Sequence, residues 1–390
     1  MMIMIDLVKN NEKAPRNLGL YIHIPFCRTK CLYCDFCSFV SRNDDEREKY
    51  VNALLAEIEQ KSTKAYLVDT IYFGGGTPSL LSVEQIERIL SCIRDNFILC
   101  ENVEITLECN PMTHIEDGKE YFSALRDLGV NRLSLGIQSA VDSELKLIGR
   151  RHTFLEARQT FFAAHESGFD NISVDLMFGI PSQTVDTLNY SLEQFVSLGA
   201  EHISIYSLQL EEGTALHRMQ SKYNFADDDT VADMSDVINS VMSNAGYNHY
   251  EISNFAKEGK ESRHNSKYWK LDEYLGLGLA AHSDFLGKRS ENTCDLTEYL
   301  QGNYTLKEQN IGELEREVEY IMLGLRMSSG ISKREFFERF HFDFDEKYGK
   351  KLNEIEKSLY INEDFEKFAL NEHGFSVSNI ILAKILDFDY

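Results

Sequence analysis

Short apolar segments alternate with longer amphipathic ones through the first half of the chain. Six of the short segments have the β-branched and aromatic composition of strands, at residues 20–24, 70–73, 103–107, 132–137, 172–177 and 202–208. Apolar residues at helical spacing fill the intervals, at residues 44–59, 83–96, 117–128, 154–166 and 187–198. Units spaced roughly thirty residues apart are typical of the βα repeat, in which parallel strands carry their helices outside. The alternation therefore predicts an α/β fold.

The number of these units limits the architecture. A closed barrel of eight βα units would need two more than the sequence offers, so we expect a partial, six-stranded (β/α)6 barrel. A helix at 227–245 and edge strands at 249–253 and 277–285 follow. Helical patterns dominate from residue 296, and a short strand at 365–370 indicates a winged-helix-like module. The expected domains are a leader at 1–18, the barrel with its extension at 19–295 and a mainly helical C-terminal domain at 296–390.

Three closely spaced cysteines follow the first predicted strand. Cys27, Cys31 and Cys34 form a CxxxCxxC motif, and Cys37 lies just beyond it. Three thiolates at this spacing can hold three irons of a [4Fe–4S] cluster and leave the fourth iron open. A structural zinc site with Cys37 as its fourth ligand is the alternative, but such sites usually take two CxxC pairs separated by about a dozen or more residues. The motif therefore favours a cluster with an iron free to bind another molecule.

A CxxxCxxC motif with an aromatic residue before its third cysteine is similar to the signature of the radical S-adenosylmethionine (SAM) enzymes. The longer string from Tyr21 to Phe36 resembles the branch that holds oxygen-independent coproporphyrinogen III oxidase and the HemW-type heme chaperones. In that family SAM binds the open iron, and the reduced cluster cleaves it to a 5′-deoxyadenosyl radical. The resemblance implies a [4Fe–4S] cluster and SAM as cofactors, with Cys27, Cys31 and Cys34 as the iron ligands.

Polar and glycine residues near the ends of the predicted strands also match this branch. Parallel barrels gather functional groups at the C-terminal ends of their strands. The resemblance implies a SAM site formed by Tyr21, Tyr33, Gly75, Gly76, Thr77, Glu108, Gln138, Arg150 and Asp175. The alternatives without a binding role are a tight turn for the glycines, solvated strand ends for Glu108 and Gln138, and a surface ion pair for Arg150. Asp175 lies in a run otherwise fit for burial, where an unpaired carboxylate is costly.

A second motif concerns heme. Residues 263–269 combine histidine and tyrosine with the chain's single tryptophan. The segment resembles the HNxxYW segment of HemW-type proteins, which is associated with heme binding, and imidazole is a common axial ligand of heme iron. His264 is therefore the candidate heme ligand, with an aromatic packing corner as the alternative. Residues 274–283 also match the branch, and His282 among them is the secondary candidate.

Two differences separate this chain from the oxidases of the branch. The oxidases carry a cysteine two positions after the third one of the motif, where this chain has Phe36. They also have a longer N-terminal segment, whereas twenty residues precede Tyr21 here. The resemblance thus favours a chaperone that binds heme and delivers it to acceptor proteins of unknown identity. The alternatives are a radical SAM enzyme acting on a tetrapyrrole, a methyltransferase of the same architecture and an iron–sulfur scaffold without SAM. Enzymatic activity is therefore left open.

The composition limits which classes of partner and which cellular compartment are expected for this protein. The 390 residues carry a formal charge of −23, which disfavours non-specific binding to nucleic acid. Without a basic stripe, the winged-helix-like module is better interpreted as a lid or docking unit than as a DNA-binding one. No apolar run reaches the roughly 18 residues of a membrane span, and no signal peptide is evident. Because clustered thiols need a reducing compartment, we expect a cytoplasmic protein without an integral membrane segment, leaving contact with a membrane surface open.

Overall fold

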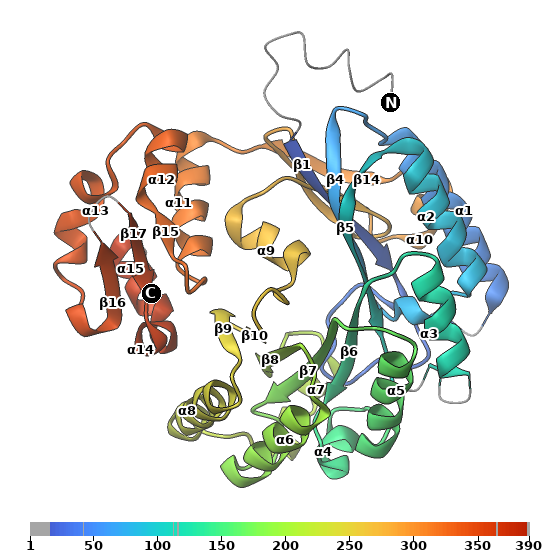
Figure 1. The fold of residues 1–390 in the computed structure, drawn as a ribbon, viewed down its shortest axis with the longest axis horizontal. Coiled ribbons are helices and arrows are strands. Elements are labelled where there is room, and N and C mark those ends of the chain that lie inside the picture. The colour runs from blue at the N-terminus through green and yellow to red at the C-terminus, as the bar shows by residue number, and fades with distance from the viewer. Residues whose placement is uncertain (1–15, 42, 112, 115–116, 364–365, 388–390) are drawn as a thin grey trace.

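A computed structural model describes residues 16–387, apart from 42, 112, 115–116 and 364–365. Its largest feature is a twelve-stranded sheet with the strand order β14-β13-β12-β11-β1-β4-β5-β6-β7-β8-β10-β9 (Figure 1). The six predicted strands lie side by side and parallel in its middle. They are β1 (Arg16–Ile24), β4 (Tyr66–Gly75), β5 (Ile98–Cys109), β6 (Arg132–Gln138), β7 (Ile172–Phe178) and β8 (His202–Ser207). The predicted α/β class is confirmed.

Helices follow these strands along the chain and cover the outer side of the sheet (Figure 1). They are α1 (Asp44–Gln60), α2 (Val83–Asn96), α3 (Gly118–Asp127), α4 (Asp142–Leu147), α5 (Phe154–Glu166) and α6 (Val185–Leu198). Capping boxes begin α2 at Ser82, α5 at Thr153 and α6 at Thr184, and satisfy amide groups that a helix start leaves free. The buried residues of these helices pack with the strands in one continuous core. This packing directs the strand ends toward a common rim.

Additional strands extend the sheet at both edges. β11 (Tyr274–Leu277) pairs parallel with β1, and β12 (His282–Phe285), β13 (Lys288–Asn292) and β14 (Thr305–Asn310) continue antiparallel. At the other edge, β10 (Asn254–Ala256) and β9 (Asn248–Glu251) follow β8 in antiparallel pairing. The predicted six strands therefore form the centre of a larger sheet, which has a seventh parallel strand in β11. The predicted edge strand at 277–285 is two strands in the structure, β11 and β12, and sequence spacing did not indicate the parallel pairing of β11 with β1.

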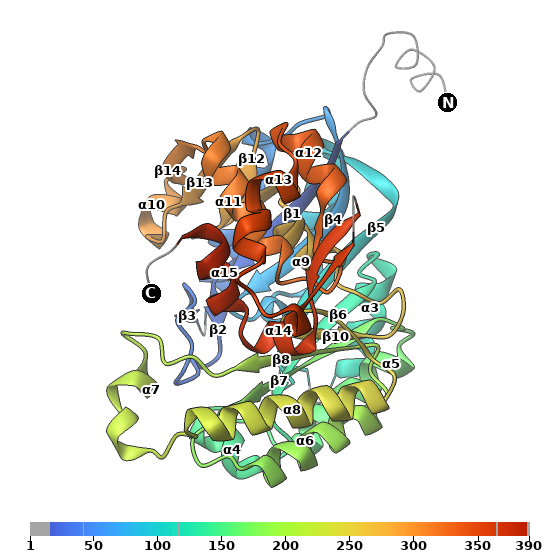
Figure 2. The same ribbon diagram turned by 90° about the vertical axis from the view of Figure 1, so that its left-hand side faces the viewer.

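The cysteine loop and the remaining helices complete this part. β2 (Phe26–Cys27) and β3 (Phe39–Val40) form a small parallel pair around the loop. Helix α8 (Asp228–Asn244) packs on α6, and α9 (Arg263–Lys270) lies between the sheet and the C-terminal unit (Figures 1 and 2). The 3-10 turns η1 (Pro78–Leu80) and η2 (Gln220–Lys222) and helix α7 (Ala215–Arg218) fill the connections.

The C-terminal unit has its own hydrophobic core. Its elements are α11 (Glu313–Gly324), β15 (Ile331–Ser332), α12 (Lys333–Phe340), α13 (Phe344–Leu352), η3 (Lys357–Leu359), β16 (Tyr360–Glu363), β17 (Lys367–Leu370), α14 (Glu372–Ser376) and α15 (Ser378–Leu386). The three strands form a separate antiparallel sheet in the order β15-β17-β16. Figure 2 shows this unit beside α9, with α14 close to α8.

The segment that begins at the predicted domain border, residue 296, packs with the large sheet. Helix α10 (Leu296–Leu300) and β14 follow residue 296 but pack with the large sheet, where the Tyr299 hydroxyl donates to Glu57 at 2.6 Å. We therefore place the start of the second unit near Glu313. Residues 1–15 of the predicted leader, and residue 365 of the predicted strand 365–370, lie outside the described residues. Within the described ranges, no helix has both the length and the apolar character that a membrane crossing requires.

Candidate functional site

The cysteine loop is held at both of its ends. The amide of Phe39 donates to the carbonyl of Pro25 at 2.7 Å, and the amide of Ser41 donates to the carbonyl of Cys27 at 3.2 Å. Between these two bonds, Nε2 of His23, near the end of β1, contacts the Cys37 carbonyl oxygen at 2.9 Å. These bonds join the loop to the end of β1, so its side chains are presented to the rim of the strands.

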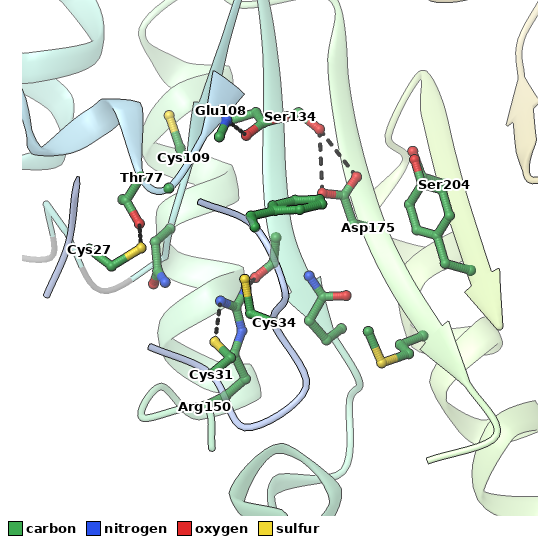
Figure 3. Close-up of a pocket in the computed structure, with 18 of the residues that line it drawn as sticks. Cys27, Cys31, Cys34, Thr77, Glu108, Cys109, Ser134, Arg150, Asp175 and Ser204 are labelled. Atoms are coloured by element: carbon green, nitrogen blue, oxygen red, sulfur yellow. Dashed lines mark hydrogen bonds between the residues drawn. The ribbon is translucent and has the colours of Figure 1, made fainter. Parts of the chain in front are cut away.

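Most of the predicted site residues share one cavity of about 400 Å³ at the C-terminal ends of the parallel strands (Figure 3). Its lining includes Cys27, Cys31, Tyr33, Cys34, Gly75, Gly76, Thr77, Glu108, Gln138, Arg150 and Asp175. The volume is within the range of small-molecule sites. Of the predicted site residues, Tyr21 and His264 lie elsewhere. The fold thus brings together residues that are up to about 150 positions apart, as parallel strand ends should.

The three cysteines are free thiols with few competing contacts. Cys27 accepts from the Thr77 hydroxyl at 3.7 Å, and Cys31 lies 3.5 Å from Arg150 Nη1 (Figure 3). Among the described residues, no three Cys, His, Asp or Glu side chains converge as one metal ion would require. A cube offers a separate iron to each thiolate and does not need that convergence. Three thiols that line one cavity match the ligand number of a [4Fe–4S] cluster with one open iron.

Two carboxyl groups face the cavity. Glu108 accepts from the Tyr72 hydroxyl at 2.8 Å and from the Gly75 amide at 3.2 Å. Burial is the main cause that raises its pKa to about 7, and the nearby Asp175 adds to the rise. Asp175 accepts from the Ser134 hydroxyl at 3.1 Å, and burial raises its pKa to about 6. Each group keeps oxygen lone pairs for ligand ammonium or hydroxyl groups.

Two arginines line the same cavity as these acids. Arg150 donates to the Gly136 carbonyl and reaches Cys31, but its Nε atom has no partner in the described part of the chain. Arg132 is buried and also has an Nε without a described partner, and its charge lowers the pKa values of both carboxyl groups. Unpaired buried donors are rare in folded proteins. Arg132 and Arg150 both line the first cavity, so their positive charges favour an anionic group such as a carboxylate there.

The glycines at the end of β4 are required by close approach. Gly75 has a φ of 110°, and a Cβ there would lie 2.5 Å from the His23 ring. A Cβ on Gly76 would lie 2.6 Å from the Phe26 carbonyl oxygen, which is backbone and cannot turn aside. The turn and the cysteine loop therefore pack backbone against backbone. Any larger residue at Gly76 would push the loop away from the rim.

Sequence analysis missed several residues that line this cavity. They are Thr29, Lys30, Phe36, Tyr72, Cys109, Asn110, Arg132, Ser134, Gly136, Met177, Ser204, Tyr206 and Asn265. The strand period of two could have identified some of these residues. Every second residue of β6 faces the same side, and Arg132, Ser134 and Gly136 lie on the side of the predicted residue Gln138. The register between β6 and β7 shifts between Gly136 and Gln138, where Gln138 has a φ of 79°. No sequence pattern indicated that irregularity.

His264 lies in a different environment. The residue is 1% exposed, and its ring atoms Nδ1 and Nε2 contact Thr70 Oγ1 at 2.8 Å and the Tyr268 hydroxyl at 2.9 Å. Its ring also stacks on Tyr72, with 5.1 Å between centroids. Burial lowers the pKa of His264 to about 3, which keeps the ring neutral. A bond to heme iron would require one of these nitrogens to give up its partner, so the assignment of His264 as heme ligand stays a prediction.

Tyr21 and Cys37 line a second cavity beside the loop, together with His282. Tyr21 contacts His23 Nδ1 through its hydroxyl at 3.0 Å. Cys37 is a free thiol whose sulfur lies 4.0 Å from the Cys294 carbonyl. Because Cys37 does not line the first cavity, its position is consistent with three cluster ligands rather than four.

Known families match both parts of the chain. The radical SAM superfamily matches residues 21–195, and the HemN C-terminal domain matches residues 313–377. The first range contains the cysteine loop and the parallel strands up to β7. The second falls within the C-terminal unit, so the two matched families correspond to the two hydrophobic cores.

Relatives match the chain over nearly its full length. It is 35% identical to the heme chaperone HemW of Lactococcus lactis subsp. lactis, covering 94% of this chain and 96% of the relative. The heme chaperone HemW of Bacillus subtilis is also 35% identical, with coverage of 94% and 98%. Among solved structures, coproporphyrinogen III oxidase (HemN) from Escherichia coli superposes with a TM-score of 0.82, covering 99% of this chain and 93% of that one. At 21% identity this likeness shows a shared fold, an α/β radical SAM architecture with a C-terminal domain.

Proposed function

We propose that this chain, which belongs to the HemW family within the radical SAM superfamily, binds heme and delivers it to acceptor proteins. In this proposal the protein also carries a [4Fe–4S] cluster and SAM. One observation carries the proposal: the chain aligns with heme chaperones over 94% of its length, so both the cysteine loop and the C-terminal unit are included. Phe36, at the position where the oxidases carry cysteine, supports the same choice.

The first cavity supplies the residues for the two cofactors. Cys27, Cys31 and Cys34 would hold the cluster as thiolates, and such a cluster when bound supplies an electron to SAM. Arg150 would pair with the carboxylate of SAM, while Glu108 would accept from its ammonium or hydroxyl groups. Both side chains are already oriented by their contacts with the strand ends. The polar groups of Arg150 and Glu108 would therefore be in place before SAM binds.

The C-terminal unit would serve the transfer step. Its three-stranded sheet and helices support a winged-helix-like description, and the chain's charge of −23 disfavours nucleic acid as its partner. We assign it a lid or docking role toward heme-accepting proteins. The free thiols favour a reducing compartment, and we place the protein in the cytoplasm.

A radical SAM enzyme that acts on a tetrapyrrole is the second candidate. The observation in its favour is the complete polar wall beside the cysteines, with two acids and two arginines facing one cavity. A protein that only carries heme has no evident use for so many SAM-directed groups. Both candidates need the cluster, so cluster content does not separate them.

Anaerobic reconstitution with iron and sulfide, followed by separate titrations with heme and SAM, tests the proposal. We expect one heme per chain at micromolar concentration, and a change in the electron paramagnetic resonance of the reduced cluster when SAM is added. A reconstituted protein that takes up no heme would overturn the chaperone function. Anaerobic turnover of coproporphyrinogen III would instead establish the enzyme.

A further inference from the structure

A second cavity, of about 420 Å³, opens directly beside the first. Phe36 and Gly75 line both cavities, so a single aromatic side chain and a glycine separate them. Phe36 is 59% exposed although it lies in a loop that is held at both ends. Exposed aromatic surface at the edge of a cavity commonly marks a binding site.

The walls of this second cavity are aromatic. Tyr21, Phe36, Tyr268 and Tyr274 line it, and the Tyr268 and Tyr274 rings meet edge to face at 4.7 Å between centroids. Its lining contains no Asp, Glu, Lys or Arg, in contrast to the first cavity. Faces of aromatic rings suit a flat, apolar ligand. The chemistry of the walls thus favours a planar macrocycle over SAM or a nucleotide.

His282 is the one metal-binding side chain that faces this cavity without a bonded partner. No described residue hydrogen-bonds to its ring, and the residue is exposed. Its neighbour His23 is buried, and both of its nitrogens already contact Tyr21 and Cys37. The remaining exposed histidines of the described chain, His165, His341 and His373, lie outside both cavities.

The backbone holds His282 firmly in this place. A Cβ on Gly276 would lie 2.1 Å from the His282 carbonyl oxygen, and the Gly276 amide donates to the Ser283 hydroxyl at 2.9 Å. Gly278, with a φ of 104°, lets the following turn pass close to the His23 carbonyl. The β11–β12 connection is therefore tightly packed against β1. A ligand atom on such a rigid element is preorganised.

We propose that the second cavity receives heme, with the His282 imidazole as axial ligand of its iron and the aromatic side chains against its faces. The inference rests on the proposed function and deepens it by assigning the iron ligand to His282 instead of His264. The neutral imidazole donates a nitrogen lone pair to ferric iron, and the water bound there in solution leaves without a change in oxidation state.

Heme titration of the full-length, anaerobically reconstituted protein tests the assignment, with the heme absorption and ferric paramagnetic resonance spectra as readouts. We expect His282→Ala to weaken heme binding at least about tenfold and to change the axial-ligand signature. Added imidazole should restore the wild-type spectrum, because the free ligand can enter the space left by the side chain. His165→Ala, at an exposed position on α5, is the matched control and should bind like the wild type.

The outcomes separate the two levels of the proposal. A wild-type protein that takes up no heme would overturn the proposed function itself. A wild type that binds heme, alongside a folded His282→Ala protein with the same affinity and spectrum, would overturn only the assignment of the ligand. A change of spectrum in Cys37→Ala but not in His282→Ala would overturn it too, since a thiolate from the same cavity would then be the ligand.

Discussion

The cysteine loop and the segment 263–269 both match motifs of the family, yet their ligand atoms have very different surroundings. The thiols of Cys27 and Cys31 face a cavity and make contacts no closer than 3.5 Å to Thr77 and Arg150. The ring nitrogens of His264 are buried and bonded at 2.8 and 2.9 Å. A motif identifies which residues to consider. Whether the ligand atoms of those residues already have hydrogen-bond partners decides whether a metal can bind without first breaking the protein's own hydrogen bonds.

This difference has an energetic scale. A buried hydrogen-bonding group that loses its partner costs about 1–3 kcal/mol. Recruiting His264 to an iron would impose that cost on Thr70 or Tyr268, whereas recruiting a cysteine thiol breaks only weak contacts with sulfur. We therefore expect variants of the cysteine loop to lose bound iron, and variants of His264 to lose folding stability.

The largest effect is expected in the cysteine loop. Replacing Cys27, Cys31 or Cys34 singly with alanine should reduce bound iron from about four atoms per chain to nearly none, because a cube held by two thiolates is not retained. Iron and acid-labile sulfide analysis after anaerobic reconstitution measures this. Cys37→Ala is the matched control, since this thiol lines the other cavity. Loss of iron from the Cys37 variant would contradict the assignment of three ligands.

His264→Ala should instead destabilise the fold. The change leaves a cavity and two unpaired hydroxyl groups, on Thr70 and Tyr268, so we expect a loss of about 2–4 kcal/mol in the free energy of unfolding. Chemical denaturation of the purified variant measures it, with His165→Ala as the exposed control. The heme spectrum of the folded variant should match the wild type. A variant of unchanged stability that no longer binds heme would show that His264 is the ligand after all.

Glu108→Gln should separate binding from stability. Loss of the charged acceptor should weaken SAM binding about tenfold or more, the scale of a charge-assisted hydrogen bond. Removing a carboxyl group whose burial raises its pKa to about 7 should at the same time stabilise the fold at alkaline pH. Calorimetric titration and thermal melting measure the two effects. Glu101→Gln, at an exposed position of the same strand, is the control and should change neither.

The smallest effect concerns pH. Because the pKa of Glu108 rises from 4.5 to about 7 on folding, the folded state binds more protons than the unfolded chain between these values. Stability should therefore fall as pH rises through this window, by about 1–2 kcal/mol after allowance for solvent in the cavity. The difference in unfolding free energy between wild type and Glu108→Gln should grow from pH 4.5 to 7 and then level off. A difference that is constant with pH would contradict this account.

The sequence by itself determined the six parallel strands, the cysteine loop and most residues of the first cavity. These features follow from local patterns: strand and helix periods, a compact cysteine spacing, and the rule that strand ends meet at one rim. Even the residues that were missed, such as Arg132 and Ser134, follow the same period of two along β6. Local patterns transfer to the fold because neighbouring positions on a strand have predictable directions.

Only the tertiary structure decided what the ring atoms of the histidines can do. The partner that engages His264 Nδ1 is Thr70, 194 positions away in the sequence, so no local pattern reveals that this nitrogen is already bonded. His282 faces a cavity because β11 inserts beside β1 and Gly276 lets β12 return closely over it. Availability of a ligand atom depends on contacts between distant segments, and those exist only once the sheet has assembled.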